Sequence, residues 1–273
     1  MFTPEEITRF NHNGYLIVRQ LAPRELCARM TAYAEEALTH EPGAALGMVE
    51  YEADLHYPGA PPAREAPGGR TVRRLLQVYA RGDLFRDWAA HPAITTRLTQ
   101  LLGPELMLSQ AHHNSLMTKQ PRYSSDTLWH QDIRYWSFEK PELISVWLAL
   151  GAEREDNGAL KFIPGSHKME FAPDRFDAAT FFRTDLPENQ ALIASAQLAE
   201  LEPGDVVFFH CHTLHAAGRN QTAHTKFSLV FTYHGADNHP LPGTRSTSLP
   251  EIVIPRAKLD SSRAKHGTIR AFR

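Results

Sequence analysis

The sequence predicts a mainly β protein in which the strands form a sandwich or barrel and the helices pack outside it. Helix signals dominate the first 103 of its 273 residues. Strand-like segments then follow, and they return over long stretches of chain. These segments are residues 105–119, 145–150, 159–163, 206–209 and 226–233. Helices followed by such strands are typical of a closed or packed sheet with helices on its outside.

The predicted helices have recognisable starts and stops. Thr3 caps a first helix, and Gly14 ends it. A short strand is expected at residues 15–18, followed by a helix over residues 23–38 with one apolar face. Two shorter helices are expected within residues 83–102. This N-terminal region is therefore predicted to form a helical cover.

Residues 41–70 are rich in glycine and proline, which interrupt regular elements. A loop of this length is uncommon in a compact domain and is often an active-site lid. It carries Tyr51, His56, Tyr57 and Arg64, which are able to contact a polar substrate. A surface loop without a functional role is an equally good interpretation.

The composition is that of an ordinary globular protein. The formal net charge is −2, so no general attraction to nucleic acid or to anionic membranes is expected. Cys27 and Cys211 offer no disulfide framework, which fits a cytoplasmic protein. The N-terminus lacks the pattern of a secretory signal, and no apolar run approaches the roughly 18 residues of a membrane span. The oligomeric state is not predicted.

A metal site is indicated by His130 and Asp132, because residues i and i+2 of a strand project from the same face. Two histidines and one carboxylate form the facial triad of non-haem Fe(II) sites. Three histidines within residues 210–215 compete for the third position. His215 is favoured because it precedes a turn rich in glycine and asparagine, and His212 is the alternative.

Two groups of cations remain open to more than one interpretation. Lys226 and Ser228 share one face of a predicted strand and suit the distal carboxylate of a dicarboxylic cosubstrate, although an exposed lysine is nearly as good an interpretation. Arginines within residues 70–74 form either a solvated face or a clamp for a substrate anion. The basic residues of the C-terminal piece, from residue 256 onward, are expected to belong to a solvated or loosely docked tail.

Several motifs together resemble the phytanoyl-CoA dioxygenase family of Fe(II)/2-oxoglutarate oxygenases, which includes ectoine hydroxylase and a bacterial proline 4-hydroxylase. The matching positions are residues 129–132, Trp136, residues 146–150, 156–160, 164–168 and 204–209, His215 and Asn220. They occur in family order, and the resemblance covers most of residues 1–235. It implies a double-stranded β-helix core, which is a jelly-roll or cupin-like fold.

The resemblance also implies a single oxygenase domain over residues 1–273. Residues 1–103 would form the helical cover, with residues 41–70 as a lid loop. Residues 104–235 would form the jelly-roll core, and residues 236–273 a C-terminal extension.

The family's iron ligands match His130, Asp132 and His215, and no further catalytic residue is expected. The family's 2-oxoglutarate-binding arginine is matched by Lys226, which keeps the charge but loses the bidentate geometry of arginine. Ser228 matches the small or hydroxyl residue two positions later.

The remaining site predictions concern the cosubstrate and the substrate. Thr127 and Trp147 are expected to contact 2-oxoglutarate. The residues expected to contact the substrate are Trp136, Arg134, His113 and Met117.

The resemblance implies hydroxylation of a C–H bond with Fe(II), 2-oxoglutarate and O2, and with release of succinate and CO2. The cationic residues 70–74 and Arg134 favour a small anionic or zwitterionic substrate. Two alternatives have no oxygenase activity: a jelly-roll isomerase or hydrolase that uses Zn or Mn, and a silent binding protein.

Overall fold

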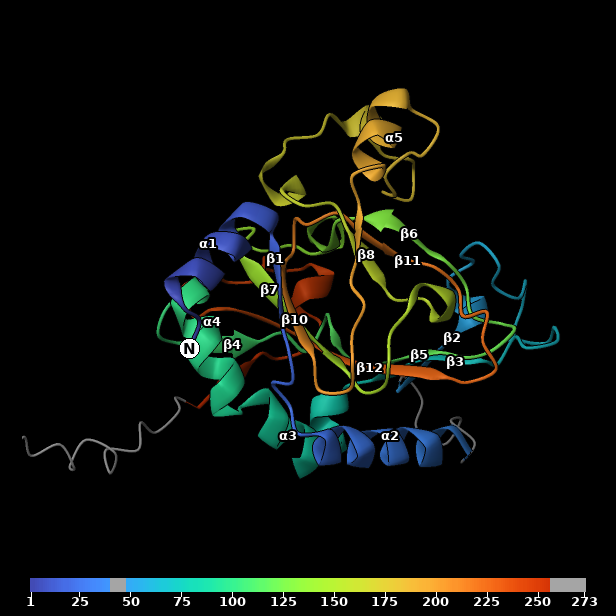
Figure 1. Ribbon diagram of the computed structural model, residues 1–273, viewed down its shortest axis with the longest axis horizontal. Helices are drawn as coiled ribbons and strands as arrows, with labels where there is room; N and C mark the ends of the chain where they lie inside the picture. The colour runs from blue at the N-terminus through green and yellow to red at the C-terminus, as the bar shows by residue number, and fades with distance from the viewer. Residues whose placement is uncertain (40–47, 256–273) are drawn as a thin grey trace, which may run out of the picture.

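The computed structural model describes residues 1–39 and 48–255, which fold into two facing antiparallel sheets with helices on the outside (Figure 1). The larger sheet has nine strands in the order β1-β10-β7-β12-β5-β3-β2, and β4 pairs with both β12 and β13. Its strands are β1 (Tyr15–Val18), β2 (Val49–Tyr51), β3 (Val72–Leu76), β4 (Leu106–Leu108), β5 (Asn114–Lys119), β7 (Leu143–Ala149), β10 (Val206–His210), β12 (Lys226–Gly235) and β13 (Ile252–Ile254).

The smaller sheet has four strands in the order β6-β11-β8-β9. These strands are β6 (Thr127–His130), β8 (Leu160–Phe162), β9 (Gln197–Leu198) and β11 (His215–Ala217). The α-helices are α1 (Pro4–Asn13), α2 (Arg24–Thr39), α3 (Asp83–Ala89), α4 (Pro92–Leu102) and α5 (Pro187–Ile193). The predicted fold class, a jelly-roll β core with flanking helices, is confirmed.

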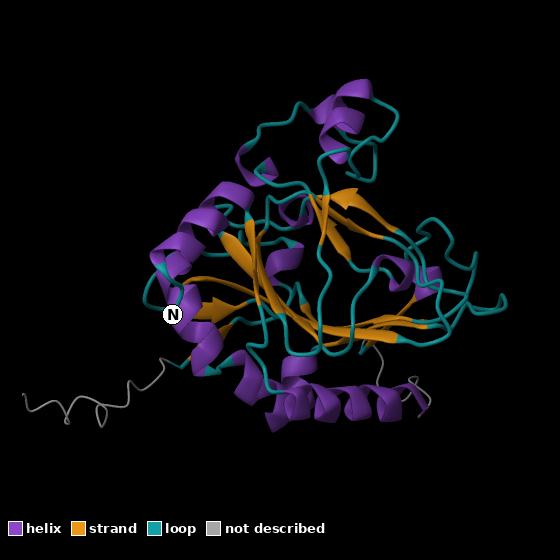
Figure 2. Cartoon of the chain, in the orientation of Figure 1, coloured by secondary structure: helices purple, strands orange, loops and turns teal. Residues whose placement is uncertain are grey.

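Strand β7 shows how the sequence separates the two sides of the large sheet. Val146 and Leu148 belong to the core shared with helices α2, α3 and α4. Trp147 and Ala149 alternate with them and belong to the core between the two sheets. The period of two sends successive side chains to opposite faces. The helices accordingly lie along the outer face of the large sheet (Figure 2).

The predicted ends of the first helix are confirmed. The Thr3 hydroxyl accepts a hydrogen bond from the Glu6 backbone, and the Glu6 carboxylate accepts one from the Thr3 backbone. Gly14 follows the helix with a φ of 80°, a left-handed conformation that favours glycine. A Cβ here would lie 2.4 Å from His167 Nδ1, so the close approach of that ring also requires glycine.

The predicted strand at residues 15–18 is confirmed as β1, but the N-terminal region contains more strand than predicted. Strands β2 and β3 from this region also extend the large sheet. The predicted lid loop contains β2 and a 3₁₀ turn at Glu52–Asp54, because β2 finds backbone partners on β3. That pairing depends on distant chain and leaves no local signal. Residues 40–47 of the loop lie outside the described residues.

Helix α5 was not predicted, since its seven residues carry only a short apolar pattern. It lies on the far side of the small sheet from α2 and α3 (Figure 1). The predicted basic tail, residues 256–273, is outside the described residues. Among the described residues, no helix has the length and apolar character needed to cross a membrane.

Candidate active site

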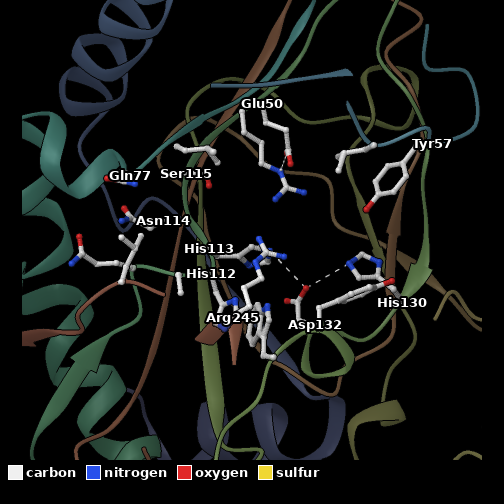
Figure 3. Close-up of a pocket in the computed structure, with 18 residues that line it drawn as sticks. Glu50, Tyr57, Gln77, His112, His113, Asn114, Ser115, His130, Asp132 and Arg245 are labelled. Atoms are coloured by element: carbon white, nitrogen blue, oxygen red, sulfur yellow. Dashed lines mark ion pairs between the residues drawn. The ribbon is translucent and has the colours of Figure 1, made fainter. Parts of the chain in front are cut away.

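Three predicted ligands meet at the open end of the small sheet. His130 ends β6, His215 begins β11, and the two residues are register partners across neighbouring antiparallel strands. One ligand atom from each histidine and from Asp132 lies within 4.8 Å of the others, and all three residues are buried. His130 Nε2 and His215 Nε2 lie 3.5 and 3.8 Å from Asp132 Oδ1. Figure 3 shows His130 and Asp132 turned toward one another.

Asp132 lies just past the end of strand β6. The strand ends at His130, Gln131 keeps an extended backbone with φ −114° and ψ 126°, and Asp132 begins a 3₁₀ helix, Asp132–Tyr135. The extended Gln131 therefore keeps Asp132 on the same side as His130, as the spacing of two residues predicts. The candidate ligands converge with His215, and not His212, in the third position.

The backbone fixes both imidazoles for metal binding. His130 Nδ1 lies 2.8 Å from the Leu128 carbonyl, and His215 Nδ1 lies 3.0 Å from the Thr213 carbonyl. A carbonyl only accepts hydrogen bonds, so each Nδ1 donates, and in the neutral ring the lone pair is then on Nε2. Burial, followed by the neighbouring His130, lowers the pKa of His215 to about 4, which keeps that ring neutral near pH 7.

The carboxylate of Asp132 completes a donor set that fits a metal ion. Burial by itself raises its pKa, but the neighbouring His113 and His215 bring that pKa well below its usual range. Asp132 Oδ2 is buried and has no hydrogen-bond partner among the described residues. A buried carboxylate with one unpartnered oxygen, beside two imidazoles whose Nδ1 atoms are already bonded, is the donor set of an Fe(II) facial triad.

An outer cavity of about 220 Å³ opens beside His130 and Asp132 (Figure 3). It is lined by Glu50, Leu55, Tyr57, Arg74, Leu76, Gln77, Gln110, Ala111, His112, His113, Asn114, Ser115, His130, Asp132, Tyr135, Trp136, Arg245 and Leu249. Two of the residues expected to contact the substrate, Trp136 and His113, are among them. Arg245 has no ion-pair partner among the described residues.

The aromatic side of this cavity is built around Trp136. Its ring stacks on His112 with centroids 4.9 Å apart, and the ring of His113 meets it edge-on at 5.2 Å. Burial, and then Arg245, lowers the pKa of His112 to about 3. His112 Nε2 bonds the Ser246 hydroxyl, which fixes the stacked ring in place. Neutral, stacked rings thus face the cavity near the metal ligands.

An inner cavity of about 60 Å³ lies between the two sheets. It is lined by Tyr57, Arg73, Arg74, His113, Met117, Thr118, Lys119, Thr127, His130, Trp147, Gly158, Leu160, Phe209, His215, Ala217 and Lys226. Met117 and three of the residues expected to contact 2-oxoglutarate, Thr127, Trp147 and Lys226, line it together. Ser228 is not among the lining residues.

Three of the four predicted cosubstrate residues share an unexpected partner, the buried Glu153. Lys226 Nζ lies 3.1 Å from Glu153 Oε2. Ser228 Oγ donates to Glu153 Oε1 over 2.6 Å, and Trp147 Nε1 donates to the same oxygen over 2.9 Å. Nothing in the polar segment around Glu153 distinguishes it, so sequence reasoning missed it.

The cavity also contains cations that were not assigned. Arg73, from the basic cluster, is buried and donates to Thr127 Oγ1 over 2.8 Å. Lys119 Nζ donates to the Ser125 carbonyl at 2.8 Å, and no carboxylate lies within ion-pair distance of it in the described part of the chain. Burial, and then the charge of Arg73, lowers the pKa of Lys119 well below its usual value.

The structure does not bring Arg134 to the site. Its guanidinium lies 3.3 Å from the centroid of the Phe176 ring, and its Nε donates to Gln131. It lines neither cavity. Arg134 is the third residue of the 3₁₀ helix Asp132–Tyr135, so its side chain leaves the helix on a different side from that of Asp132.

The fold and the site define a class of protein: a jelly-roll with a two-histidine, one-carboxylate metal centre, typical of non-haem iron oxygenases. The sequence model of the phytanoyl-CoA dioxygenase (PhyH) family matches residues 10–228. The chain therefore belongs to this family of Fe(II)/2-oxoglutarate-dependent dioxygenases. The predicted enzyme class is confirmed, with Fe(II), 2-oxoglutarate and O2 as metal and cosubstrates.

Similar proteins come from several organisms. The chain is 25% identical over 267 residues to peroxisomal phytanoyl-CoA dioxygenase of Homo sapiens, with 93% of this chain and 75% of that protein covered. It is 24% identical over 251 residues to ectoine dioxygenase of Stutzerimonas stutzeri (strain A1501), with 86% and 77% covered.

Solved structures share the fold. The epimerase SnoN in complex with Fe3+, alpha ketoglutarate and nogalamycin RO has a TM-score of 0.70 and 23% identity, covering 90% of this chain and 89% of that one. EctD from S. alaskensis with 2-oxoglutarate and 5-hydroxyectoine has a TM-score of 0.72 and 18% identity, covering 88% and 78%.

Proposed function

We propose that this chain hydroxylates a C–H bond of a small anionic or zwitterionic molecule and releases succinate and CO2. The observation that carries this proposal is the outer cavity, which joins the metal ligands to a cation without a carboxylate partner in the described part of the chain. His130, Asp132 and His215 would hold the iron. Iron bound there, together with 2-oxoglutarate and O2, supplies the oxidation of an unactivated C–H bond.

The protein's own residues would hold and orient the reactants. The Leu128 and Thr213 carbonyls keep the two imidazoles in the tautomer that leaves Nε2 free. Lys226, Thr127 and Trp147 line the inner cavity, where the cosubstrate would lie against the same ligands. The rings of Trp136 and Tyr57 line the outer cavity and would cover a substrate bound there.

Charge supports the proposed substrate class. Arg74 is paired with Glu50 at 2.9 Å, so those two charges offset each other. Asp132 belongs to the metal site. Arg245 is then the cation left to meet a substrate carboxylate or phosphate. A cavity of about 220 Å³ favours a small molecule.

The function is tested by measuring succinate with Fe(II), O2 and 2-oxoglutarate over a panel of small acids and amino acids. We expect succinate release that requires both iron and oxygen and increases with one class of acid. Activity that persists without O2, or that needs Zn instead of iron, would contradict the proposal.

Arg245→Ala is expected to raise the substrate KM about tenfold, because one charge-assisted contact to an anion is lost. Substrate-independent 2-oxoglutarate turnover should stay unchanged, since Arg245 does not line the inner cavity. Arg134→Ala is the matched control, because Arg134 lines neither cavity. A larger KM change for Arg134→Ala than for Arg245→Ala would remove Arg245 from the substrate site.

We also propose a cytoplasmic protein of one domain. Both cysteines, Cys27 and Cys211, are free and buried, which suits a reducing compartment.

A further inference from the structure

We propose that Glu153 determines which 2-oxo acid the inner cavity accepts, because its carboxylate already holds the donors available for an acid's distal carboxylate. This inference rests on the proposed function and deepens it. It predicts a cavity that prefers a dicarboxylic acid only weakly over a 2-oxo acid with an uncharged tail.

The hydrogen bonds of Glu153 are complete within the protein. One carboxylate oxygen, Oε1, accepts from Ser228 Oγ at 2.6 Å and from Trp147 Nε1 at 2.9 Å. The other, Oε2, accepts from Lys226 Nζ at 3.1 Å. Three donors on neighbouring strands β7 and β12 therefore converge on one side chain. This is the hydrogen-bond pattern that a bound carboxylate would require.

Glu153 is also firmly held at its backbone. Its N–H donates to the Leu201 carbonyl at 2.9 Å, and the Leu201 N–H donates back at 3.1 Å. The guanidinium of Arg154 donates to both carbonyls. The side chain itself has no exposed surface. Displacing its carboxylate therefore requires a new rotamer inside a packed core, so Glu153 stays bonded to Lys226 and Trp147, which line the inner cavity.

The charge balance points the same way. Lys226 is buried, and its charge is matched one-to-one by Glu153. A second carboxylate brought to Lys226 would lie near that of Glu153, and like charges in a buried place repel strongly. An uncharged tail meets no such repulsion. Lys119 also lines the cavity, but its Nζ is directed to the Ser125 carbonyl at 2.8 Å.

The test compares two acids of equal carbon-chain length. 2-Oxoglutarate and 2-oxopentanoate differ in the distal carboxylate, and both can be titrated into Fe(II)-loaded protein without O2 by calorimetry. We expect the wild type to discriminate between them less than about tenfold. Glu153→Ala frees Lys226, Ser228 and Trp147, so its preference for 2-oxoglutarate should rise by more than about tenfold, the lower end of the coupling between close charge pairs.

Two further variants keep the test decisive. Glu153→Gln removes the charge but keeps the size of the side chain and one oxygen for Trp147 and Ser228. It replaces the alanine variant if that variant does not fold. Its preference for 2-oxoglutarate over 2-oxopentanoate should rise as well. Glu155→Ala is the matched control, because Glu155 lies on the same segment and pairs with Lys161 at the surface. Its preference should equal that of the wild type.

The outcomes that overturn the proposal are distinct. Folded Glu153 variants that bind both acids with the wild-type preference would show that Glu153 merely positions Lys226, and the proposed function would stand. A wild type that prefers 2-oxoglutarate by 100-fold or more would also overturn the proposal that Glu153 determines the choice of acid. If no variant binds either acid, both this proposal and the proposed function fail. If the Glu153 variants bind 2-oxoglutarate and the wild type does not, the proposed role of Glu153 is supported.

Discussion

Asp132→Ala is expected to abolish iron binding and succinate release while leaving the fold intact. Removing a partner outside the metal's direct ligands typically costs 10–100-fold in metal affinity, so removing a ligand should cost more than about 100-fold. The carboxylate lies among imidazoles that keep it ionised, and its Oδ2 has no other partner in the described chain. Calorimetric titration with Fe(II) under anaerobic conditions measures the loss.

Thermal unfolding separates metal loss from misfolding. A metal that binds the native state stabilises it by about 2.7 kcal/mol when present at 100 times its Kd, so iron should raise the Tm of the wild type. It should leave the Tm of Asp132→Ala unchanged. His113→Ala is the matched control, since His113 Nε2 lies 3.7 Å from Asp132 Oδ1 but is not part of the triad, and it should weaken iron binding less than Asp132→Ala does. Equal iron responses in Asp132→Ala and the wild type would exclude the assigned site.

The two-histidine, one-carboxylate site was predictable because its parts have local signals. The spacing of His130 and Asp132, and the turn rich in glycine and asparagine that follows His215, can be read along the chain. The register then needs only one pairing, β6 with β11, to bring both histidines together. The fold class was predictable for a similar reason, since strands such as β12 carry long apolar patterns.

Long-range partners were not predictable. Glu153 meets Lys226 across 73 positions of sequence, and nothing in its neighbourhood marks it as buried. Arg245 lines the outer cavity, although it lies in residues 236–273, which were expected to form a C-terminal extension. Charged residues are seldom fully buried without a partner, but the sequence does not say which partner is supplied. The family resemblance identified Lys226 as a departure, and the structure adds the acid that accompanies it.

A second buried pair, Glu52 with Arg73, connects the segment after residue 47 to the metal site. Glu52 Oε2 accepts from Arg73 Nη1 at 3.1 Å and from the Ser125 hydroxyl at 2.6 Å. Arg73 in turn donates to Thr127, at the start of the strand that ends in His130. Both charged side chains are almost completely buried. These hydrogen bonds connect Glu52 and Arg73 to Thr127 on strand β6, which also carries the metal ligand His130.

Glu52→Ala is therefore expected to lower the free energy of unfolding by about 3–5 kcal/mol, because it leaves the buried Arg73 charge without its partner. Urea unfolding measures the change. Glu50→Ala, on the adjoining strand β2, is the matched control, because its pair with Arg74 is about one-fifth exposed and its loss should cost less than that of the fully buried pair. The double variant Glu52→Met with Arg73→Met should recover part of the loss, since no buried charge is left unpaired. If Glu52→Ala and Glu50→Ala cost the same, the buried pair does not stabilise this part of the fold.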